Sequence, residues 1–294
     1  MGLKKNIKKM LFGMSPRFAD VLFRRPDIDL EKKKRMESEN EILHLDLVIT
    51  ECCSLKCRDC SNLMQYYHTP QNLSTDEVIK DLDTLLGSIN LGELKILGGE
   101  PFVNPKVLSA VLRYLSEVPA GKVGAVKIIT NGTVLPSTEC IDAMKNNPKT
   151  EVVFSSYGEL SSRQNEMIGI CRDNGIRYTV MDDTFYWIDF GPLKKHDESD
   201  KFVSRQYENC YNRKNCNTLY RGRVYVCPRQ AHGIHLGLIP EVNGEYVDLY
   251  DTAGKDPEAL RQEVIGLVRR TQPVSACGYC LYGKFRHVPP CVQE

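Results

Sequence analysis

The middle of the chain alternates between short apolar runs and amphipathic segments. Five apolar runs have the length of strands and predict them at Ile42–Thr50, Leu94–Leu97, Val123–Thr130, Val152–Ser155 and Ile176–Val180. Between these runs, apolar residues recur at helical spacing. Repeated strand–helix units favour parallel strands joined by right-handed crossovers. We therefore expect an α/β fold built as a complete or partial barrel, with function at the carboxyl ends of its strands.

Local signals indicate where the helices begin and end. Ser74 and Glu77 form a capping box, and Asn104-Pro105 supplies an N-cap followed by a first-turn proline. A third helix over Ser161–Asp173 should end at Asn174-Gly175, because these residue types tolerate the left-handed conformation of a helix terminus. Each helix then lies between two predicted strands, as a barrel requires.

The pattern changes at both ends of the chain. Residues 1–40 are basic and helix-prone, and this extension either caps the barrel or lies with its apolar face on a membrane surface or a partner. Farther along, residues 216–227 alternate and turn at Arg221-Gly222, which predicts a β-hairpin that sets Cys216 opposite Cys227. We therefore expect three parts: the extension (1–40), the barrel (41–200) and a small Cys-rich domain of hairpin and helix (201–294).

The composition narrows the class of protein. Lys+Arg 39 against Asp+Glu 38 gives a net charge of +1, so no global field favours nucleic acid as a partner. No apolar run approaches the ~20 residues of a membrane span, and the N-terminus lacks the apolar core of a secretory signal. The 12 cysteines then favour metal binding in a reducing compartment over disulfides. We expect a cytoplasmic, oxygen-sensitive protein.

Three cysteines directly follow the first predicted strand at the spacing Cys53-x3-Cys57-x2-Cys60. Three thiolates can hold three irons of a four-iron cluster, whose usual ligand set is four cysteines. The fourth iron is then left open for a small molecule, as a catalytic zinc keeps one position free. Zinc itself suits this loop poorly, because it prefers four ligands and C-x2-C pairs. The spacing therefore favours an iron–sulfur cluster with one open corner.

Further candidate residues stand at the ends of later strands. Gly98-Gly99-Glu100-Pro101 closes the second strand, where glycines either make a tight β–α turn or let the backbone approach a ligand closely. Asn131 follows the third strand, and Ser155-Ser156 ends the fourth. Because the carboxyl ends of parallel strands meet at one rim, we expect these segments near the cysteine triad.

The cysteine triad followed by Gly-Gly-Glu-Pro resembles the radical S-adenosylmethionine (SAM) superfamily. The resemblance implies a partial (β/α)6 barrel with a [4Fe–4S] cluster on Cys53, Cys57 and Cys60. It also implies that SAM is bound at the strand ends, by Gly98, Gly99, Glu100, Pro101, Asn131, Ser155 and Ser156. Family members commonly carry an aromatic residue just before the last cysteine, and Asp59 stands there instead. How the adenine packs is therefore left open.

In this superfamily, one electron from the reduced cluster breaks the sulfur–C5′ bond of SAM. Methionine leaves, and the 5′-deoxyadenosyl radical takes a hydrogen atom from an unactivated substrate C–H. The resemblance thus implies SAM and a [4Fe–4S] cluster as cofactors, and an electron donor such as flavodoxin or ferredoxin as a partner. The protein must hold the substrate close to the radical and exclude water and oxygen.

The last third of the chain is rich in cysteines: Cys210, Cys216, Cys227, Cys277, Cys280 and Cys291. Their spacing resembles the auxiliary-cluster domains called SPASM and the shorter form, twitch, as in the 2-deoxy-scyllo-inosamine dehydrogenases. The resemblance implies one auxiliary [4Fe–4S] cluster on Cys210, Cys227, Cys277 and Cys280, with Cys216 as a substitute for Cys210. Whether Cys291 takes part stays open. From spacing alone, a zinc ribbon on the C-x2-C pair and the hairpin also fits.

The leading hypothesis is a dehydrogenase or epimerase that acts on a hydroxyl-bearing carbon of a small sugar, cyclitol or polyol. The auxiliary cluster would accept the electron left on the substrate, and a base would accept the hydroxyl proton. The base is not identified, and only residue type marks His68, His232 and His235 as candidates. Two alternatives stay open: an enzyme that matures a peptide or protein, and a zinc-stabilised binding module without catalysis.

Other residues have no assigned chemistry. The segment that contains Tyr186, Trp187 and Asp189 either lines the substrate space or forms a core strand. Cys52 adjoins the triad, and Cys140 and Cys171 fall on predicted helices. We expect these three cysteines to be ordinary buried thiols, because free cysteine packs as a small apolar residue.

Overall fold

The computed structural model describes residue 38 and residues 40–182, 187–251 and 256–294. The predicted basic helix of the N-terminal extension and Tyr186 lie outside these ranges. Among the described residues, no helix is long and apolar enough to cross a membrane.

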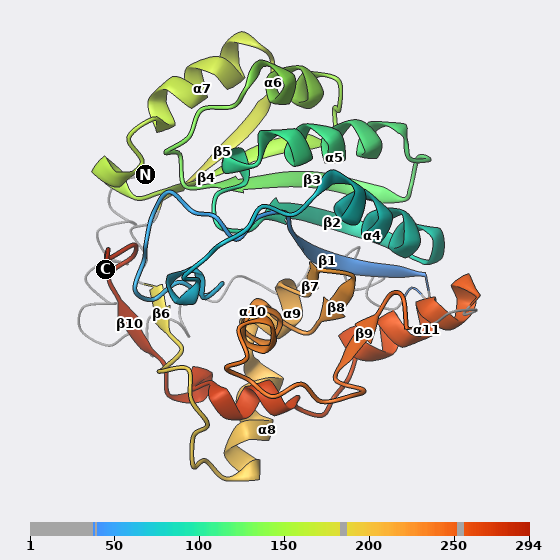
Figure 1. Cartoon of the computed structure of the whole chain (residues 1–294), viewed down its shortest axis with the longest axis vertical. Coiled ribbons are helices and arrows are strands. Elements are labelled where there is room, and N and C mark those ends of the chain that lie inside the picture. Colours follow the sequence, from blue (N-terminus) through green and yellow to red (C-terminus); the bar gives the residue numbers. More distant parts are fainter. Residues whose placement is uncertain (1–37, 39, 183–186, 252–255) are drawn as a thin grey trace, which may run out of the picture.

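One eight-stranded sheet forms the centre of the molecule, with its strands in the order β5-β4-β3-β2-β1-β7-β8-β9 (Figure 1). The parallel strands are β5 (Arg177–Asp182), β4 (Thr150–Ser156), β3 (Val123–Thr130), β2 (Asn90–Leu97), β1 (Glu41–Val48) and β7 (Thr218–Tyr220). Two antiparallel strands complete it, β8 (Arg223–Tyr225) and β9 (Tyr246–Asp248). The five predicted strands and the partial α/β barrel are therefore confirmed, and the sheet is open rather than closed.

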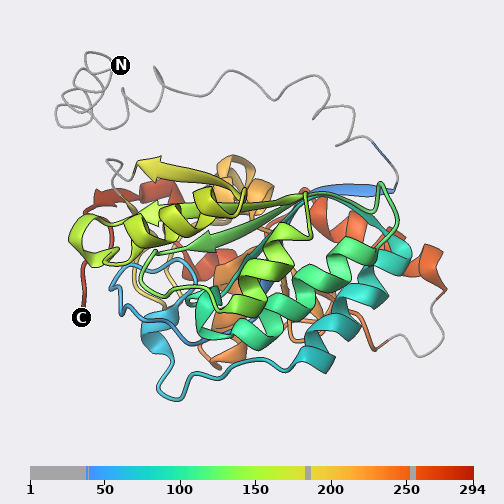
Figure 2. The same cartoon turned by 90° about the horizontal axis from the view of Figure 1, so that it is seen from above.

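Four helices cover one face of the parallel strands, as the two views show (Figure 2). They are α4 (Thr75–Ser88), α5 (Pro105–Glu117), α6 (Thr138–Lys145) and α7 (Gln164–Asp173). The predicted capping box of Ser74 and Glu77 is present at α4. The helix expected from Ser161 begins three residues later, because the Ser161 hydroxyl accepts a 2.8 Å hydrogen bond from the Tyr157 amide and closes the preceding turn. The core lies between these helices and the sheet, and it buries the expected thiols Cys140 and Cys171.

The opposite face of the strands carries charged pairs. The Nδ1 atom of His44 on β1 lies 3.3 Å from Glu93 on β2, and Lys127 on β3 reaches the same carboxylate at 2.5 Å. Next along the strands, Lys95 lies 3.2 Å from Asp46. The two polar residues inside the first apolar run therefore face partners on the neighbouring strand.

The predicted hairpin is formed by β7 and β8, with Tyr220 paired to Arg223 and positive φ angles at the two turn residues. Because β7 also pairs with β1, the hairpin extends the barrel sheet itself, across the boundary expected near residue 200. The ladder ends at Thr218 and Tyr225, so the expected opposition of Cys216 and Cys227 is not part of it. The hairpin supplies the sixth parallel strand.

The remaining C-terminal elements lie below strands β1 to β5 in the view of Figure 1. They are α8 (Asp200–Asn209), α9 (Tyr211–Asn215), α10 (Pro228–His235), α11 (Pro257–Val268) and two 3-10 turns, η4 (Ser275–Tyr279) and η5 (Tyr282–Lys284). A separate two-stranded sheet pairs β6 (Trp187–Asp189) with β10 (Arg286–Val288). The segment around Trp187 is therefore a strand of this small sheet and not of the barrel.

Candidate functional site

The triad cysteines lie in the loop that joins β1 to α4, where Cys57 is buried and Cys53 and Cys60 are half-buried. Burial, with the neighbouring thiols, raises the pKa of Cys53 to about 12, and burial also raises the pKa of Cys60. Thiolates are therefore costly here without a nearby positive charge. A bound iron cluster supplies that charge, since thiolates are the metal-binding form. These three residues fit the cluster that the resemblance implies.

The two glycines after β2 pack against the backbone that precedes the triad. A Cβ atom on Gly98 would lie 2.2 Å from the carbonyl oxygen of Thr50, and one on Gly99 would lie 2.1 Å from that of Cys52. Hydrogen bonds of 2.9 Å hold the segments together, from the Gly99 amide to Thr50 and from the Glu100 amide to Cys52. The glycines are thus needed for the contact between two loops, in addition to any contact with SAM.

Glu100 turns its side chain into the protein. It is fully buried and accepts hydrogen bonds from the Asn131 amide (2.8 Å), the Thr130 hydroxyl (2.8 Å) and the Phe102 amide (3.2 Å). Burial raises its pKa to about 7. Pro101 is buried beside it, at the start of η2 (Pro101–Val103). The Glu100 carboxyl therefore positions the end of β3.

Asn131 is brought directly to the triad. Its Nδ2 atom lies 3.1 Å from the Ser54 hydroxyl and 3.7 Å from the sulfur of Cys53. Ser155 and Ser156 stand at the end of β4, one strand farther along the sheet. Ser155 is buried, and its carbonyl accepts a 3.4 Å hydrogen bond from Ser161. The strand ends thus meet at one rim, with β3 nearer the triad than β4.

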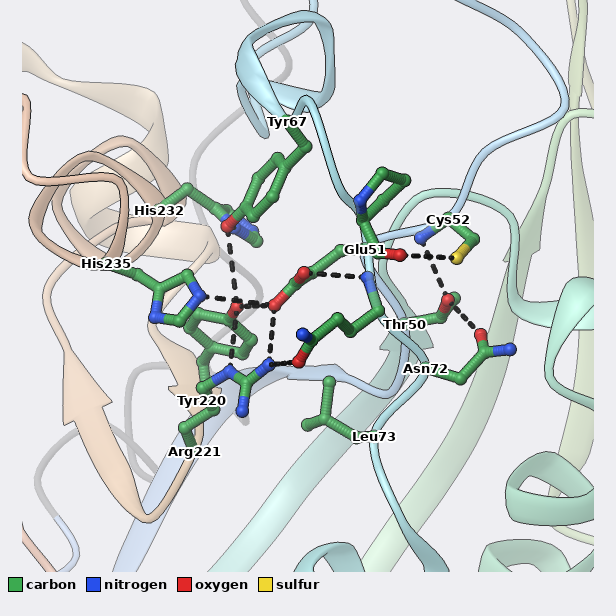
Figure 3. A network of polar contacts seen from close by, with 12 residues as sticks. Thr50, Glu51, Cys52, Tyr67, Asn72, Leu73, Tyr220, Arg221, His232 and His235 are labelled. Atoms are coloured by element: carbon green, nitrogen blue, oxygen red, sulfur yellow. Dashed lines mark hydrogen bonds and ion pairs between the residues drawn. The ribbon is translucent and has the colours of Figure 1, made fainter.

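A buried carboxylate joins the strand before the triad to the C-terminal hairpin (Figure 3). Glu51 accepts hydrogen bonds from the Tyr220 hydroxyl, from Arg221 at 2.8 Å and from the Gln71 amide at 2.9 Å, and His235 lies 3.3 Å away. Burial by itself raises the pKa of Glu51, but the hydrogen bonds outweigh it and hold the pKa below its ordinary value. We call these five residues, with Tyr67 and His232, the Glu51 network.

The three histidines considered as bases have different surroundings. His232 is fully buried, with Nδ1 2.7 Å from the Tyr67 hydroxyl, and burial lowers its pKa to about 3. His235 contacts Glu51, and burial lowers its pKa too. His68 is exposed in the loop after η1 (Met64–Tyr66). His232 and His235 therefore hold α10 against the triad loop. The sequence had marked them as candidates by residue type alone.

Four C-terminal thiols line a single pocket: Cys210, Cys227, Cys277 and Cys280. Burial raises the pKa of each, to about 12 at Cys277 and about 11 at Cys280. The side chain of Gln206 orders the C-x2-C segment by donating to the carbonyls of Cys277 (2.7 Å) and Cys280 (3.1 Å). These are the four residues that the resemblance to a twitch domain implies, and they converge from α8, α10 and η4.

The other two C-terminal cysteines lie elsewhere. Cys216 does not line that pocket, and it interacts with Asp46 and Lys95 on the charged face of the barrel. Cys291 lies at the triad, with its sulfur 3.2 Å from that of Cys57. This contact lowers the pKa of Cys57 to about 7 and, with burial, raises that of Cys291. Cys210 rather than Cys216 therefore lines the pocket with Cys227, Cys277 and Cys280. Cys291 lies with the triad cysteines instead.

Within the described ranges, no group of three or more His, Cys, Asp or Glu side chains is compact enough for a single metal ion. A four-iron cluster does not need so compact a set, because each thiolate binds a different iron. Cys52, expected to be buried, is half-buried, and its sulfur lies 3.6 Å from the Pro70 carbonyl.

A polar pocket of about 170 Å³ lies between the two sets of cysteines. Cys60 of the triad lines it, and so do Phe190 and Arg229, which also line the four-thiol pocket. Its charged lining residues are Arg58, Asp59, Asp189, Arg229 and Glu294. Arg229 is held in place by donating to the carbonyls of Gly191 (2.8 Å) and Tyr279 (3.0 Å). Asp189 therefore faces this polar pocket, whereas Trp187 packs edge-on against Tyr157.

Comparison with known proteins identifies the part of the chain that contains the cysteine triad. Residues 47–156 match the family model of the radical SAM superfamily. This segment is a radical SAM domain. It contains the cysteine triad, the Gly98–Pro101 turn and Asn131, so the strand ends that meet at the rim belong to this domain.

Curated relatives match this domain over part of their length. A GTP 3′,8-cyclase of Streptomyces coelicolor is 28% identical over 96 residues, which cover 32% of this chain and 27% of the relative. The enzymes of the same name from Clostridium acetobutylicum (29% identical, 32% and 28% covered) and Agrobacterium fabrum (25% identical, 36% and 33% covered) are similar. The matches therefore span about a third of the relatives' length.

Several solved structures match this chain at low identity. Native anSMEcpe with bound AdoMet and Kp18Cys peptide is 14% identical, with 86% of this chain and 92% of that chain covered and a TM-score of 0.47. BtrN in complex with AdoMet and 2-DOIA is 12% identical (82% and 94% covered, TM-score 0.45). Streptococcus suis SuiB bound to precursor peptide SuiA is 15% identical (78% and 68% covered, TM-score 0.43). Likeness at this level carries nothing about substrate.

The residues that join the radical SAM domain to the rest of the chain could not be recognised from the sequence pattern. Glu51 lies about 170 positions before Tyr220 and Arg221, and no local spacing in the sequence connects it to them. Arg58 and Arg229, on the polar pocket, lie beside cysteines of the two sets but belong to no motif. Proximity in sequence to the predicted ligands was the one signal that could have drawn attention to them.

Proposed function

We propose that this protein is a radical SAM oxidoreductase with one auxiliary [4Fe–4S] cluster, which oxidises a hydroxyl-bearing carbon of a small sugar, cyclitol or other polyol. The observation that carries the proposal is the single pocket lined by Cys210, Cys227, Cys277 and Cys280, beside a polar pocket that reaches Cys60. Four converging thiols suit a cluster. Two cluster sites on either side of a polar space suit a reaction that supplies a radical and removes an electron.

Within this proposal the side chains have distinct parts. When bound, the clusters and SAM supply a 5′-deoxyadenosyl radical that takes a hydrogen atom, and an acceptor for the electron left on the substrate. Cys53, Cys57 and Cys60 hold the first cluster, and Asn131 orders the loop around Cys53. Loss of the hydroxyl proton completes a net two-electron oxidation to a ketone. The electron that begins the reaction comes from a donor such as a flavodoxin or ferredoxin.

The lining of the polar pocket supports a small polar substrate. Arg58 and Arg229 can donate to hydroxyl oxygens, while Asp59 and Asp189 can accept from hydroxyl groups. The volume of the pocket is about 170 Å³. A polyol of a few carbons fits such a space better than a length of peptide does.

One observation favours a second candidate, an enzyme that matures a peptide. The edge strand β5 exposes three large apolar residues, Tyr178, Val180 and Met181. An extended peptide can add to a sheet edge through main-chain hydrogen bonds. A panel of polyols and of short peptides, assayed for deuterium transfer from substrate to 5′-deoxyadenosine, separates the two candidates.

Two cysteine variants test the division of labour between the clusters. Cys53→Ala should abolish SAM cleavage, because it removes a ligand of the first cluster. Cys277→Ala should spare cleavage and stop product formation, because it removes a ligand of the electron acceptor. Both are measured after anaerobic reconstitution, with iron and sulfide analysis and separation of products. Full product from Cys277→Ala would contradict the redox role, and uptake of zinc without iron would favour the non-catalytic alternative.

A further inference from the structure

The end of the described chain lies along the triad loop. Residues 291–294 run beside residues 56–58, and Cys57 and Gln293 form an antiparallel bridge. Three hydrogen bonds of 2.8 Å fix the two segments: Arg58 amide to Val292 carbonyl, Lys56 amide to Gln293 side chain, and Glu294 amide to Lys56 carbonyl. The tail is therefore built against the loop that presents Cys57.

This contact buries a fourth thiol at the triad. Cys291 is 2% exposed, and its sulfur lies 3.2 Å from that of Cys57. The side-chain amide of Gln293 donates toward both sulfurs, at 3.3 Å to Cys57 and 3.4 Å to Cys291. Cys291 has a positive φ of 56°, which a non-glycine residue rarely adopts and which turns the chain at this point. The sequence left open whether Cys291 takes part in the auxiliary set, and the fold brings it to the triad instead.

We propose that Cys291 is a displaceable fourth thiolate for the cluster at Cys53, Cys57 and Cys60. The inference rests on the proposed function, which puts a cluster there. Four cysteines are the usual ligand set of a four-iron cluster, and three leave one iron exposed to loss. With a cluster bound and SAM absent, Cys291 would hold that iron once its sulfur moves away from Cys57, because thiolates on different irons of one cluster are not in contact. On exchange for SAM, the departing Cys291 thiolate would gain a proton and the ammonium group of SAM would lose one, so protons balance and no electron is transferred.

The three residues after Cys291 would then set how readily it is displaced. They hold the tail through hydrogen bonds at the rim of the loop, without regular structure of their own beyond the bridge. Such a tail can leave the loop without disturbing the sheet. The cap thus combines a buried thiol with a short, separable anchor.

The test uses spectroscopy and not activity. In a Cys277→Ala/Cys280→Ala background, which removes the auxiliary cluster, the full chain is reconstituted without SAM and treated with ferricyanide. The electron paramagnetic resonance signal of a three-iron cluster then reports loss of the exposed iron. We expect the signal to rise several-fold in Cys291→Ala relative to the background, and to fall in both when SAM is added first. Deletion of residues 292–294 should give an intermediate signal.

Cys52→Ala is the matched control, because Cys52 adjoins the triad but its sulfur contacts Pro70. Its signal should equal that of the background. If Cys291→Ala, the tail deletion and Cys52→Ala all match the background while iron content stays at one cluster, Cys291 is not a ligand and the inference fails alone. If the background takes up no iron at all, the proposed function fails with it.

Discussion

Buried ionisable side chains surround the triad, and each is held by particular partners. Glu100 takes three hydrogen bonds from β3 and η2, and its pKa of about 7 reflects burial. Glu51 keeps a low pKa because Tyr220 and Arg221 donate to it. Side chains fixed in this way position a loop whose thiols must meet one cluster. At the scale of single residues, the buried carboxylates of Glu51 and Glu100 hold the segments beside the triad in place.

Gly99 offers a direct test of the loop contact. Gly99→Ala would place a Cβ atom 2.1 Å from the backbone carbonyl of Cys52, and overpacking of this kind costs roughly 1–3 kcal/mol. Urea unfolding of the cluster-free protein measures the loss. Gly87→Ala, in α4 with nothing within 4 Å of the new methyl group, is the control and should stabilise by about 0.5–1 kcal/mol. Equal stability of the two variants would contradict the close packing.

Asp189 tests the assignment of the polar pocket. Asp189→Asn keeps the shape but removes the charge, so turnover of the proposed polyol substrate should fall several-fold. Stability should change by less than ~1 kcal/mol, since the ion pair with Arg286 (2.8 Å) involves an exposed arginine. Arg286→Gln removes the same ion pair without touching the pocket lining and should retain turnover. A loss of turnover in both variants would mean that Asp189 acts through the small sheet.

The element scale shows why the barrel strands were predictable. Their buried positions produce apolar runs, and each run is followed by a turn or a helix signal. The missed start of β2 contains Gly92, where a Cβ atom would lie 2.9 Å from the Leu43 carbonyl, so the neighbouring strand demands a residue that weakens the pattern. Helix α6, which was expected at Cys140 without bounds, is short, and its cap at Ser137 is not accompanied by a long apolar stripe that would fix its length.

The hairpin was predicted correctly as an element, but its pairing with the barrel sheet was not predicted. Its alternation and its Arg221-Gly222 turn are local, whereas its pairing with β1 depends on two short stretches, Asp46 with Thr218 and Leu47 with Leu219. Two-residue pairings leave no signal in a sequence. The position of β7 therefore had to come from the structure.

The charged face of the barrel gives a pH prediction. Burial raises the pKa of Glu93, but the hydrogen bonds and charges of His44 and Lys127 outweigh it and hold the pKa at about 2. A carboxyl with a lowered pKa stabilises the fold above its ordinary value of 4.5 and loses that contribution as the pH falls toward 2. Glu93→Gln should therefore cost ~1–3 kcal/mol at pH 7 and progressively less in acid.

Denaturant unfolding of the cluster-free protein between pH 7 and pH 3 checks this expectation. Glu159→Gln, at an exposed carboxyl in the 3-10 turn after β4, should follow the wild-type curve and serves as control. A Glu93→Gln curve that runs parallel to the wild-type curve at all pH values would show that this ion pair does not contribute to folding.

At the scale of the whole molecule, one continuous sheet leads both to the triad and, through the hairpin, to Cys227 of the second set. The parallel strands lead into the triad loop, and the hairpin on the other side of β1 leads through Cys227 into α10. The Glu51 network ties these parts together across about 170 positions of sequence. The polar pocket lies where they meet. Spacing alone identified the cysteines, but their grouping into two sites required the fold.

The central claim is that this protein cleaves SAM by one-electron reduction at its radical SAM domain. The most direct measurement is the yield of 5′-deoxyadenosine and methionine when the anaerobically reconstituted full chain is mixed with SAM and dithionite. The account predicts both products in equal amounts from wild type and none from Cys53→Ala. Protein that contains its full complement of iron and sulfide but yields no 5′-deoxyadenosine would contradict it.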